Sequence, residues 1–371
     1  MERLRICQLI TELAPAGAER CVYELARRLD RRRFDVRVAA LRGGAVADWL
    51  ARQGIPVHVL GLGWRLDVRK LAKLAGLLRA WRVQLLHTHL FHADLAGRLA
   101  ADLAGVPRLV HTVHTVEARF RPWQYAFARL WAGRCERVIC VSASARRAHA
   151  RRSGLPAWRY CVIPNGVDVA AFGPDPAVRA EMRRQWGIGP GQVLAAYAGR
   201  LDYDKGLDVL MSAVGRLGPR GGEVRVVIAG QGPLRGALEK FIACGEGGRA
   251  CRYLGFVEDI RPMLWAADML VAPSRWEGFG LAAAEAMAAG LPVVGTRIAG
   301  LSDVVADGRT AVLVGPEDAF ALAEAIWRLA RDAPLRQRLG QAGRERVARL
   351  FPISANVAAH EALYEQLAGG V

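Results

Sequence analysis

Short apolar segments alternate with helical patterns along nearly the whole chain of 371 residues. Segments such as LRICQLI (4–10) and VRVVIAG (224–230) are nearly continuous in β-branched and other apolar residues, which is typical of strands buried on both faces of a parallel sheet. The stretches between them carry helix signals, for example KGLDVLMSAVGRL (205–217). This βα alternation predicts an α/β fold built from doubly wound parallel sheets.

The chain is longer than one hydrophobic core usually supports, so two domains are expected. The strand candidates fall into two groups, separated by a segment rich in Pro and Gly around residues 164–192. We therefore predict an N-terminal Rossmann-like domain (1–170), a linker (171–192), a C-terminal domain (193–350) and a C-terminal helix (351–371) that crosses back. Ligands of such sheets bind beyond the carboxyl ends of the strands, so the expected site is a cleft across which the two domains face each other.

Several classes of protein are disfavoured by composition. The seven cysteines are scattered, odd in number and without a C-x-x-C pair, which disfavours a zinc site and a disulfide framework and points to a reducing, cytoplasmic setting. No uninterrupted apolar stretch of about 18 residues occurs, so no transmembrane helix is expected. The N-terminal stretch of 20 residues is interpreted as a first β-strand and not as a signal peptide.

The positive charge is concentrated in the N-terminal half. Residues 1–180 hold 30 Lys and Arg against 14 Asp and Glu, a net charge of +16, whereas residues 181–371 hold 22 against 21, a net charge of +1. Such asymmetry suggests that nucleic acid, an anionic membrane or an anionic substrate meets the first half. Arg outnumbers Lys 48 to 4, as a biased genome also produces, so a functional basic face and a compositional bias both remain open.

Two cations follow a predicted strand of the second half. Arg200 comes directly after VLAAYAG, and Lys205 stands where the next helix begins. Cations beside a helix N-terminus at a carboxyl edge suit a diphosphate, which Arg can grip as a fork and Lys as a point charge. The alternative is an ordinary surface loop in which Asp202 and Asp204 form local ion pairs. The glycines of the later turn GQG (230–232) do not form a G-x-G-x-x-G motif, so a nicotinamide cofactor gains no support.

Two glutamates occupy the segment PSRWEGFGLAAAEAMAAG (273–290). Glu277 falls in the loop after the predicted strand MLVAPS, and Gly280 precedes a helix expected over about residues 281–289. Glu285 lies about one turn into this helix, which is otherwise apolar all round and therefore predicted to be buried. Carboxylates in such places are suited to accept hydrogen bonds from sugar or ribose hydroxyls.

This segment resembles the Glu-x7-Glu signature of retaining GT-B glycosyltransferases of the group 1 type, also called family 4. The resemblance extends over most of the chain in a consistent order. Its further motifs are AGAE (16–19), VIPNGVD (162–168), GRLDYDKG (199–206) and LGFVEDI (254–260). The loop at Ala16 departs from the Gly-Gly usual in the family, so only Gly17 is carried over.

The resemblance implies a role for each matched residue. Arg200 and Lys205 would neutralise the donor diphosphate, Glu285 would accept from the ribose, and Glu277 would hold the transferred sugar. The other implied donor contacts are through the backbones of Gly17, Val257, Phe279, Gly280 and Leu281. His114, at the end of RLVHTVH, resembles the family's histidine near the reacting centre. No cofactor and no metal are implied, since helix termini and the two cations would carry the diphosphate charge. His87, His89 and His92 form H-x-H-x-x-H, which we interpret as a packing and hydrogen-bonding cluster and not as metal ligands.

The expected function is transfer of a sugar from a UDP- or GDP-sugar to a glycan or lipid-linked acceptor, in cell-surface polysaccharide or glycolipid synthesis. The mixed Arg and aromatic segment 119–134 suggests docking on the inner face of the plasma membrane, although the same aromatics could simply pack on the sheet. A sugar-nucleotide epimerase of similar shape is the alternative enzyme. A nucleic-acid-binding protein is disfavoured because no RNP, KH or helix-turn-helix pattern occurs.

Overall fold

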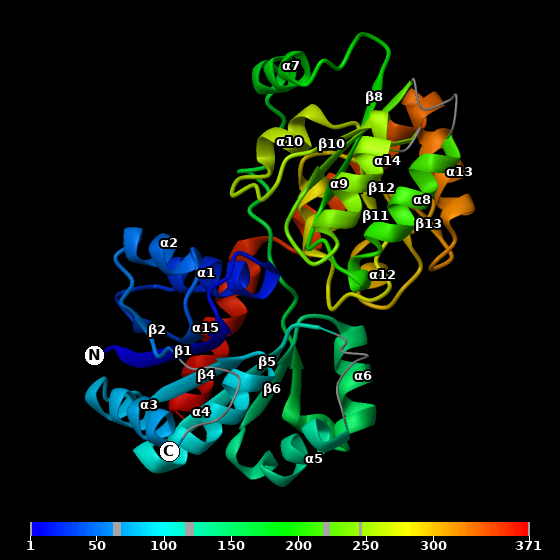
Figure 1. Ribbon diagram of the computed structural model, residues 1–371. Helices are drawn as coiled ribbons and strands as arrows, with labels where there is room; N and C mark the ends of the chain where they lie inside the picture. Colours follow the sequence, from blue (N-terminus) through cyan, green and yellow to red (C-terminus); the bar gives the residue numbers. More distant parts are fainter. Residues whose placement is uncertain (1, 62–67, 116–121, 218–222, 245–246, 370–371) are drawn as a thin grey trace. The chain divides into compact units, whose positions relative to one another are not determined.

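The computed structural model describes residues 2–61, 68–115, 122–217, 223–244 and 247–369. The described chain forms two compact units (Figure 1). Unit 1 comprises residues 1–166 and 354–371, and unit 2 comprises residues 167–353. Each unit contains one parallel sheet, and both confirm the predicted two-domain Rossmann-like class.

Unit 1 contains a seven-stranded sheet in the order β3-β2-β1-β4-β5-β6-β7. Its strands are β1 Leu4–Glu12, β2 Phe34–Arg42, β3 Val57–Val59, β4 Leu85–His89, β5 Arg108–Val113, β6 Arg137–Cys140 and β7 Tyr160–Val162. Its helices are α1 Gly17–Arg28, α2 Val46–Arg52, α3 Val68–Ala80, α4 Phe91–Ala104, α5 Pro122–Leu130, α6 Ala143–Ser153 and α15 Ile353–Gly369.

Unit 2 contains a six-stranded sheet in the order β10-β9-β8-β11-β12-β13. Its strands are β8 Val193–Ala198, β9 Val224–Ala229, β10 Cys251–Tyr253, β11 Met269–Ala272, β12 Val293–Thr296 and β13 Ala311–Val314. Its helices are α7 Pro176–Gln185, α8 Leu207–Leu217, α9 Arg235–Cys244, α10 Arg261–Ala266, α11 Leu281–Ala288, α12 Leu301–Val304, α13 Ala319–Arg331 and α14 Ala333–Leu350. Every strand segment predicted from the sequence overlaps one of these strands.

The strand order creates a topological switch point in each sheet. In unit 1 the chain builds outward from β1 to β3 and then returns to the other side of β1 with β4. Unit 2 repeats this around β8 and β11, which pair in parallel at Met269–Ala195 and Leu270–Ala196. Loops that follow β8 and β11 therefore leave the same edge of the sheet in opposite directions, the place where ligands of such sheets usually bind.

Alternate residues of the unit 1 strands enter different cores. Cys7 and Leu9 of β1 join the large apolar cluster that α3 and α4 cover, whereas Ile10 joins the cluster beneath α1 and α2. This follows from the two-residue side-chain period of a strand. Gln8 of β1 and Phe34 of β2 contact Tyr364 of α15, which belongs to unit 1 although it follows unit 2 in the chain. The predicted return of the C-terminal helix is therefore present.

Residues 171–192, predicted as a linker, pack instead as part of unit 2. The reason lies in two arginines of α7. Arg179 donates to the carbonyl oxygens of residues 265–267 and pairs with Asp268 at 2.5 Å, and Arg183 pairs with Asp268 at 3.0 Å. The carboxylate of Asp268 also accepts from the amide of Leu194 in β8, so α7 is tied to the first strand of the unit. The boundary between the units lies at Gly166–Val167.

Candidate active site

The predicted donor-site residues of unit 2 gather at one edge of its sheet. All strands of this sheet run parallel, so the segments after β8, β10 and β11 leave at their carboxyl ends. These segments carry Arg200 and Lys205, then Val257, and then Glu277. Residues separated by more than 70 positions in the sequence thus share one edge.

Lys205 and Glu277 meet across the switch point. Lys205 ends the short 3₁₀ helix η3 (Tyr203–Lys205) after β8, and Glu277 lies in the loop after β11. The Lys205 Nζ atom lies 2.7 Å from Glu277 Oε1, which also accepts from Ser274 Oγ at 2.9 Å. Within the described residues, Glu277 Oε2 makes no hydrogen bond, so it remains able to accept one from a ligand hydroxyl. The lysine and glutamate side chains are only 23% and 16% exposed, so their charges face each other in a partly desolvated place.

Arg200 forms ion pairs with Asp202 and Asp204, as the alternative of an ordinary surface loop predicted. Its Nη2 donates to Asp204 Oδ2 at 2.5 Å, and its Nη1 lies 3.5 Å from Asp202 Oδ2. The Arg200 side chain nevertheless remains 53% exposed, whereas that of Asp204 is buried. The guanidinium is therefore tethered on one side and open on the other, an arrangement that leaves donors available to an anion.

Asp202 and Asp204 also form an Asp-x-Asp sequence, which our expectation of a metal-free diphosphate site did not take into account. Both carboxylates face Arg200. Asp204 Oδ1 is buried without a hydrogen-bond partner among the described residues. The single Arg200 guanidinium offsets one of the two carboxylate charges of this pair.

Arg275 joins the two loops that carry the site. Its guanidinium lies over the ring of Tyr203, with the central carbon 3.6 Å from the ring centroid, and donates to the Tyr203 carbonyl oxygen at 2.6 Å. It also pairs with Asp208 of α8 through two hydrogen bonds of 2.8 Å. The pairing with Asp208 raises the pKa of Arg275 and keeps it charged. Arg275 therefore holds the Lys205 segment against the Glu277 segment.

Two glycines permit the close approach of these loops. Gly206 has φ of +65°, and a Cβ there would lie 2.0 Å from the carbonyl oxygen of Pro273. Gly300 has φ of +84°, and a Cβ there would lie 2.2 Å from the carbonyl oxygen of Glu277. Both positions combine a backbone conformation that favours glycine with direct backbone contact, so larger residues would displace the site loops.

The predicted helix after Glu277 is confirmed as α11, Leu281–Ala288, with Gly280 as its N-cap at φ of +93°. Phe279 is buried and packs edge-on against Phe351, with ring centroids 5.2 Å apart. The amide groups at Gly280 and Leu281 begin the helix and lie where its dipole favours negative charge. Glu285 is 7% exposed within α11, in agreement with the predicted burial.

Val257, the residue expected to meet the base, lies in the loop after β10 and is half-buried. The β10 strand pairs with β9, which in turn pairs with β8. The loop therefore leaves the same edge as Arg200 and Lys205, two strands away. This position is compatible with contact to a different part of the ligand from the part that the cations meet.

Gly17 and His114 belong to unit 1. Gly17 is the first residue of α1, and a Cβ there would meet no atom within 4 Å, so packing within the unit does not require glycine. Ala16 has φ of −127°, an extended conformation that alanine adopts without strain. The departure from Gly-Gly at this loop is thereby explained.

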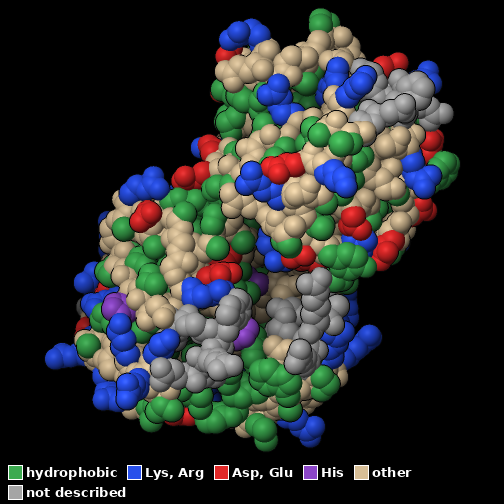
Figure 2. All heavy atoms as spheres, in the orientation of Figure 1, with side chains coloured by type: hydrophobic (Ala, Val, Ile, Leu, Met, Phe, Trp, Pro, Cys, Tyr) green, Lys and Arg blue, Asp and Glu red, His purple; other side chains and the backbone are tan. Residues whose placement is uncertain are grey.

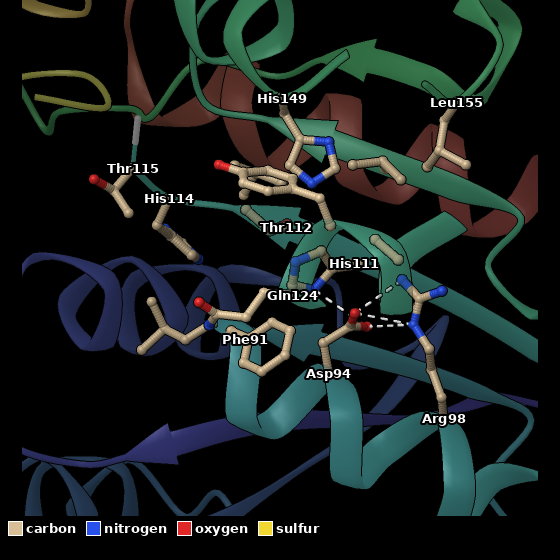
Figure 3. Close-up of a pocket in the computed structure, with 15 residues that line it drawn as sticks. Phe91, Asp94, Arg98, His111, Thr112, His114, Thr115, Gln124, His149 and Leu155 are labelled. Atoms are coloured by element: carbon tan, nitrogen blue, oxygen red, sulfur yellow. Dashed lines mark hydrogen bonds and ion pairs between the residues drawn. The ribbon is translucent and has the colours of Figure 1, made fainter. Parts of the chain in front are cut away.

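His114 follows β5 and lines a pocket of unit 1 (Figure 3). Phe91 and Asp94 of α4, Gln124 of α5 and His149 of α6 line the same pocket. The His114 Nε2 atom lies 2.9 Å from His89 Nδ1. Burial lowers the pKa of His114 to about 3, so this ring is neutral at physiological pH.

Asp94 and Arg98 form a buried ion pair at the base of this pocket (Figure 3). Arg98 Nε donates to both oxygens of Asp94 at 3.0 and 2.9 Å, and the Thr88 hydroxyl donates to Asp94 Oδ1 at 2.8 Å. Although burial opposes it, the Arg98 charge holds the pKa of Asp94 below its usual value. The Asp94 carboxylate and the Arg98 guanidinium neutralise each other, which is the condition for burying an ion pair.

Sequence reasoning did not identify Ser274, Arg275 or Gly206 as site residues. Ser274 and Arg275 lie in the same loop as Glu277, so their position after a buried strand was the available signal. Their contacts with Glu277 and with Tyr203 depend on strands that are far apart in sequence. His87 and His89 lie inside a hydrogen-bonded cluster, as interpreted from the sequence. No group of three or more potential metal ligands occurs in the described part of the chain.

The chain matches two family models in succession. Residues 15–171 match the model described as Glycosyltransferase Family 4, and residues 178–346 match the model described as Glycosyl transferases group 1. Unit 1 and unit 2 thus each correspond largely to one of the models.

Curated relatives and a solved structure agree with these matches. The chain is 33% identical to the D-inositol 3-phosphate glycosyltransferase of Pseudarthrobacter chlorophenolicus over 70% of its own length and 66% of that relative's, and 35% identical to the protein of the same description from Xylanimonas cellulosilytica over 79% and 75%. It is 26% identical to the Escherichia coli UDP-Gal:alpha-D-GlcNAc-diphosphoundecaprenol alpha-1,3-galactosyltransferase over 86% of each chain. The crystal structure of Anabaena Alr3699/HepE in complex with UDP-glucose superposes with a TM-score of 0.88 at 24% identity, covering 98% of this chain and 100% of that one. The chain therefore belongs to the group 1 family of GT-B glycosyltransferases.

Proposed function

We propose that this protein is a retaining glycosyltransferase that moves a sugar from a UDP- or GDP-sugar to a glycan or lipid-linked acceptor. The observation that carries the proposal is the Lys205–Glu277 pair at the switch point, next to the N-terminus of α11. A cation, a carboxylate and a helix N-terminus together match the phosphate, the hydroxyls and the negative charge of a nucleotide sugar.

The proposed chemistry uses these groups where charge develops. As the bond between the sugar and the diphosphate breaks, positive charge grows on the sugar and negative charge grows on the leaving phosphate. Arg200, Lys205 and the amides at the start of α11 would stabilise the leaving phosphate, and Glu277 Oε2 would accept from the sugar. Attack from the same face as departure, with the leaving phosphate assisting removal of the acceptor proton, would retain the anomeric configuration.

The donor class is supported by similarity. The Anabaena structure contains UDP-glucose, and the name of the Escherichia coli relative includes UDP-galactose as donor and a diphosphoundecaprenol acceptor. These are properties of those proteins, and they indicate which ligands to try first with this one. They favour a uridine nucleotide and a role in cell-surface polysaccharide or glycolipid synthesis.

A thermal-shift panel with UDP-, GDP-, ADP- and dTDP-sugars tests the donor site directly. One nucleotide class should raise the melting temperature by about 5 °C at 100 times its dissociation constant, because it binds the folded state alone. Each titration is run with and without EDTA, since Asp202 and Asp204 form an Asp-x-Asp sequence; an unchanged shift is expected. Free hexose serves as the control. If no nucleotide shifts the melting temperature, the assignment of a donor site to unit 2 is wrong.

The epimerase alternative is separated by a simple incubation. The protein is mixed with its best-binding nucleotide sugar and no acceptor, and the sugar is identified after hydrolysis. A transferase leaves the donor stereochemistry unchanged, whereas accumulation of an epimer would replace the proposed function with the alternative.

Unit 1 is proposed to dock on an anionic membrane surface. Trp123 and Leu130 of α5 are 54% and 82% exposed, and Arg129 is exposed beside them. Figure 2 shows hydrophobic side chains gathered in the part of unit 1 where α5 lies in Figure 1, with Lys and Arg side chains around them. Apolar side chains among basic ones suit the boundary between lipid headgroups and acyl chains.

Residues 119–121 of the predicted interfacial segment lie outside the described residues. No described helix is long and apolar enough to span a bilayer.

Liposome flotation tests this docking. The protein should float with vesicles that contain anionic lipid and remain largely unbound with neutral vesicles, because both charge and apolar contact contribute. Leu130→Asp should reduce flotation several-fold. Phe320→Asp is the matched control, because Phe320 is a similarly exposed apolar residue of unit 2 at 63%. Equal and negligible binding to both vesicle types would contradict membrane docking.

A further inference from the structure

The face of the unit 1 sheet that α15 covers contains a row of buried polar side chains. Gln8 of β1 and His87 of β4 are opposite each other in the register, and both are fully buried. His89 is also buried, and it lies two residues beyond His87, on the same face of β4. Tyr364 of α15 is fully buried against this row. Because polar groups in such a place are costly unless they are hydrogen-bonded, their arrangement is constrained.

The row forms a continuous chain of hydrogen bonds from α15 to the carboxyl end of β5. Gln8 Nε2 donates to Tyr364 Oη at 3.0 Å, and Gln8 Oε1 lies 2.6 Å from His89 Nε2. His89 Nδ1 lies 2.9 Å from His114 Nε2. The last member of the chain, His114, is the residue that the family resemblance places near the reacting centre.

A branch of the same network holds the tyrosine hydroxyl. His87 Nδ1 lies 2.6 Å from Tyr364 Oη, and His87 Nε2 lies 2.7 Å from Thr112 Oγ1. Because Tyr364 Oη already accepts from Gln8, its own proton is directed to His87 Nδ1, and His87 Nε2 donates to Thr112. In this arrangement the Gln8 amide has its nitrogen toward Tyr364 and its oxygen toward His89.

The direction of each later bond follows from the Gln8 oxygen. A carboxamide oxygen only accepts, so His89 Nε2 carries the proton of that ring. Burial lowers the pKa of His89 well below its usual value, so the ring is neutral and its Nδ1 is an acceptor. His114 must then donate through Nε2. Since His114 is neutral as well, its Nδ1 carries no proton, and Nδ1 has no hydrogen-bond partner in the part of the chain that the structure describes.

We propose that Gln8 and Tyr364 are positioning residues that fix His114 in its Nε2–H tautomer. The bare Nδ1 can then only accept a hydrogen bond, and a substrate hydroxyl is the group that would donate to it. The inference rests on the proposed function, because His114 takes part in sugar transfer only if the protein is a glycosyltransferase with this histidine near the reacting centre. It also links α15, the C-terminal helix, to the chemistry through a hydroxyl that never contacts substrate.

The tautomer is measured directly by long-range ¹H–¹⁵N correlation spectra of the full chain labelled at its histidines. His114 signals are assigned by their loss in His114→Gln. In the wild-type protein, both His89 and His114 should be Nε2–H tautomers. In Gln8→Leu, His89 loses its acceptor and the His114 signals should move to the averaged positions of an exchanging pair. Tyr364→Phe frees the Gln8 amide and should shift them in the same direction.

Tyr160→Phe is the matched control. Tyr160 is also a buried tyrosine of unit 1 whose hydroxyl lies 2.9 Å from a histidine nitrogen, that of His149, but it is outside the chain that leads to His114. Its variant should leave the His114 tautomer unchanged. An Nδ1–H tautomer of His114 in the wild type, or an unchanged tautomer in both Gln8→Leu and Tyr364→Phe, would overturn the proposal.

Kinetics provide the second measurement. Tyr364→Phe should lower kcat about 10-fold and leave the donor KM within about two-fold, the size of effect typical when an outer partner of a functional histidine is removed. The spectra need no substrate, so they test the tautomer even if the donor panel finds no ligand. A fixed tautomer with no donor binding would refute the proposed function alone, and donor binding with a free tautomer would refute this inference alone.

Discussion

Lys205→Met should lower the rate of sugar transfer by about 100-fold or more while the protein remains folded. Lys205 is the cation that lies against Glu277 at the switch point, at 2.7 Å and only partly exposed to water. A charge fixed where negative charge develops is worth about 10²–10³ in rate, because it needs no reorganisation during the reaction. The rate is measured as UDP or GDP release with the donor that the thermal-shift panel selects.

Two further variants make this prediction specific. Lys240→Met is the control, because Lys240 is an exposed lysine of α9 in the same unit. Its variant should keep the wild-type rate. Glu277→Gln should also abolish most transfer, and because the two side chains touch, the double variant should lose much less than the product of the two single losses. Wild-type turnover in Lys205→Met, with the melting temperature unchanged, would remove the pair from the active site.

Unit 1 should lose about 6 kcal/mol of stability between pH 7.5 and pH 5, because three of its buried histidines are held neutral. Burial lowers the pKa of His360 to about 4 and places the pKa values of His87 and His89 well below the usual value of 6.5. The unfolded chain binds protons at these rings below about pH 6.5, whereas the folded unit does not, so stability falls as the pH falls. One ring that stays neutral at pH 5 costs about 2 kcal/mol there. The neutral histidines stabilise the folded unit fully at pH values above their unfolded pKa. This stabilisation is lost as the pH falls toward their lower pKa in the folded protein.

The expected loss is comparable to the whole stability of a typical domain, so unit 1 should begin to unfold near pH 5. Urea unfolding followed by far-UV circular dichroism at pH 7.5, 6.5, 5.5 and 5.0 measures the dependence. Asp94, whose pKa is lowered from 3.8, adds to acid unfolding only at still lower pH and does not contribute in this range.

His360→Gln isolates one of these rings. His360 Nδ1 donates to the carbonyl oxygen of Asn356, a bond that a glutamine amide can replace, so the variant should fold. It should lose about 2 kcal/mol less than the wild type between pH 7.5 and pH 5. His58→Gln, in β3 and outside the cluster, is the comparison variant for the same change of residue type. Equal pH dependence of His360→Gln and the wild type would show that His360 is charged in the folded protein.

The sequence was sufficient to predict the strands, the helices and the α/β fold class. Apolar runs such as LRICQLI and VRVVIAG predict buried strands because a strand covered on both faces must be apolar along most of its length. The helix after Glu277 followed from a run of alanines bounded by glycines, and α11 spans Leu281–Ala288. Arg200, Lys205 and Glu277 could be selected because each follows a strand or precedes a helix, and Glu285 because it is a charged residue in an otherwise apolar helix.

The tertiary structure decided which residues these site residues contact. That Lys205 lies on Glu277 depends on β8 and β11 being neighbours, and strand order is not encoded in any local pattern. For the same reason residues 171–192 were predicted as a linker, although Arg179 and Arg183 tie them to Asp268 more than 80 residues away. Hydrogen bonds and ion pairs between distant segments form only after the sheet has set their distance.

Unit 1 illustrates the same division within one strand. Gln8 in LRICQLI is a polar residue in an apolar run, and the sequence alone shows only that this position is unusual. Its meaning comes from Tyr364, 356 residues later, and from His89, because α15 and β4 pack around β1. Local periodicity determined which side chains would be buried, since it follows from backbone geometry. Only the folded chain decided which of the buried polar groups would meet, because that depends on the order of the strands and on where the last helix packs.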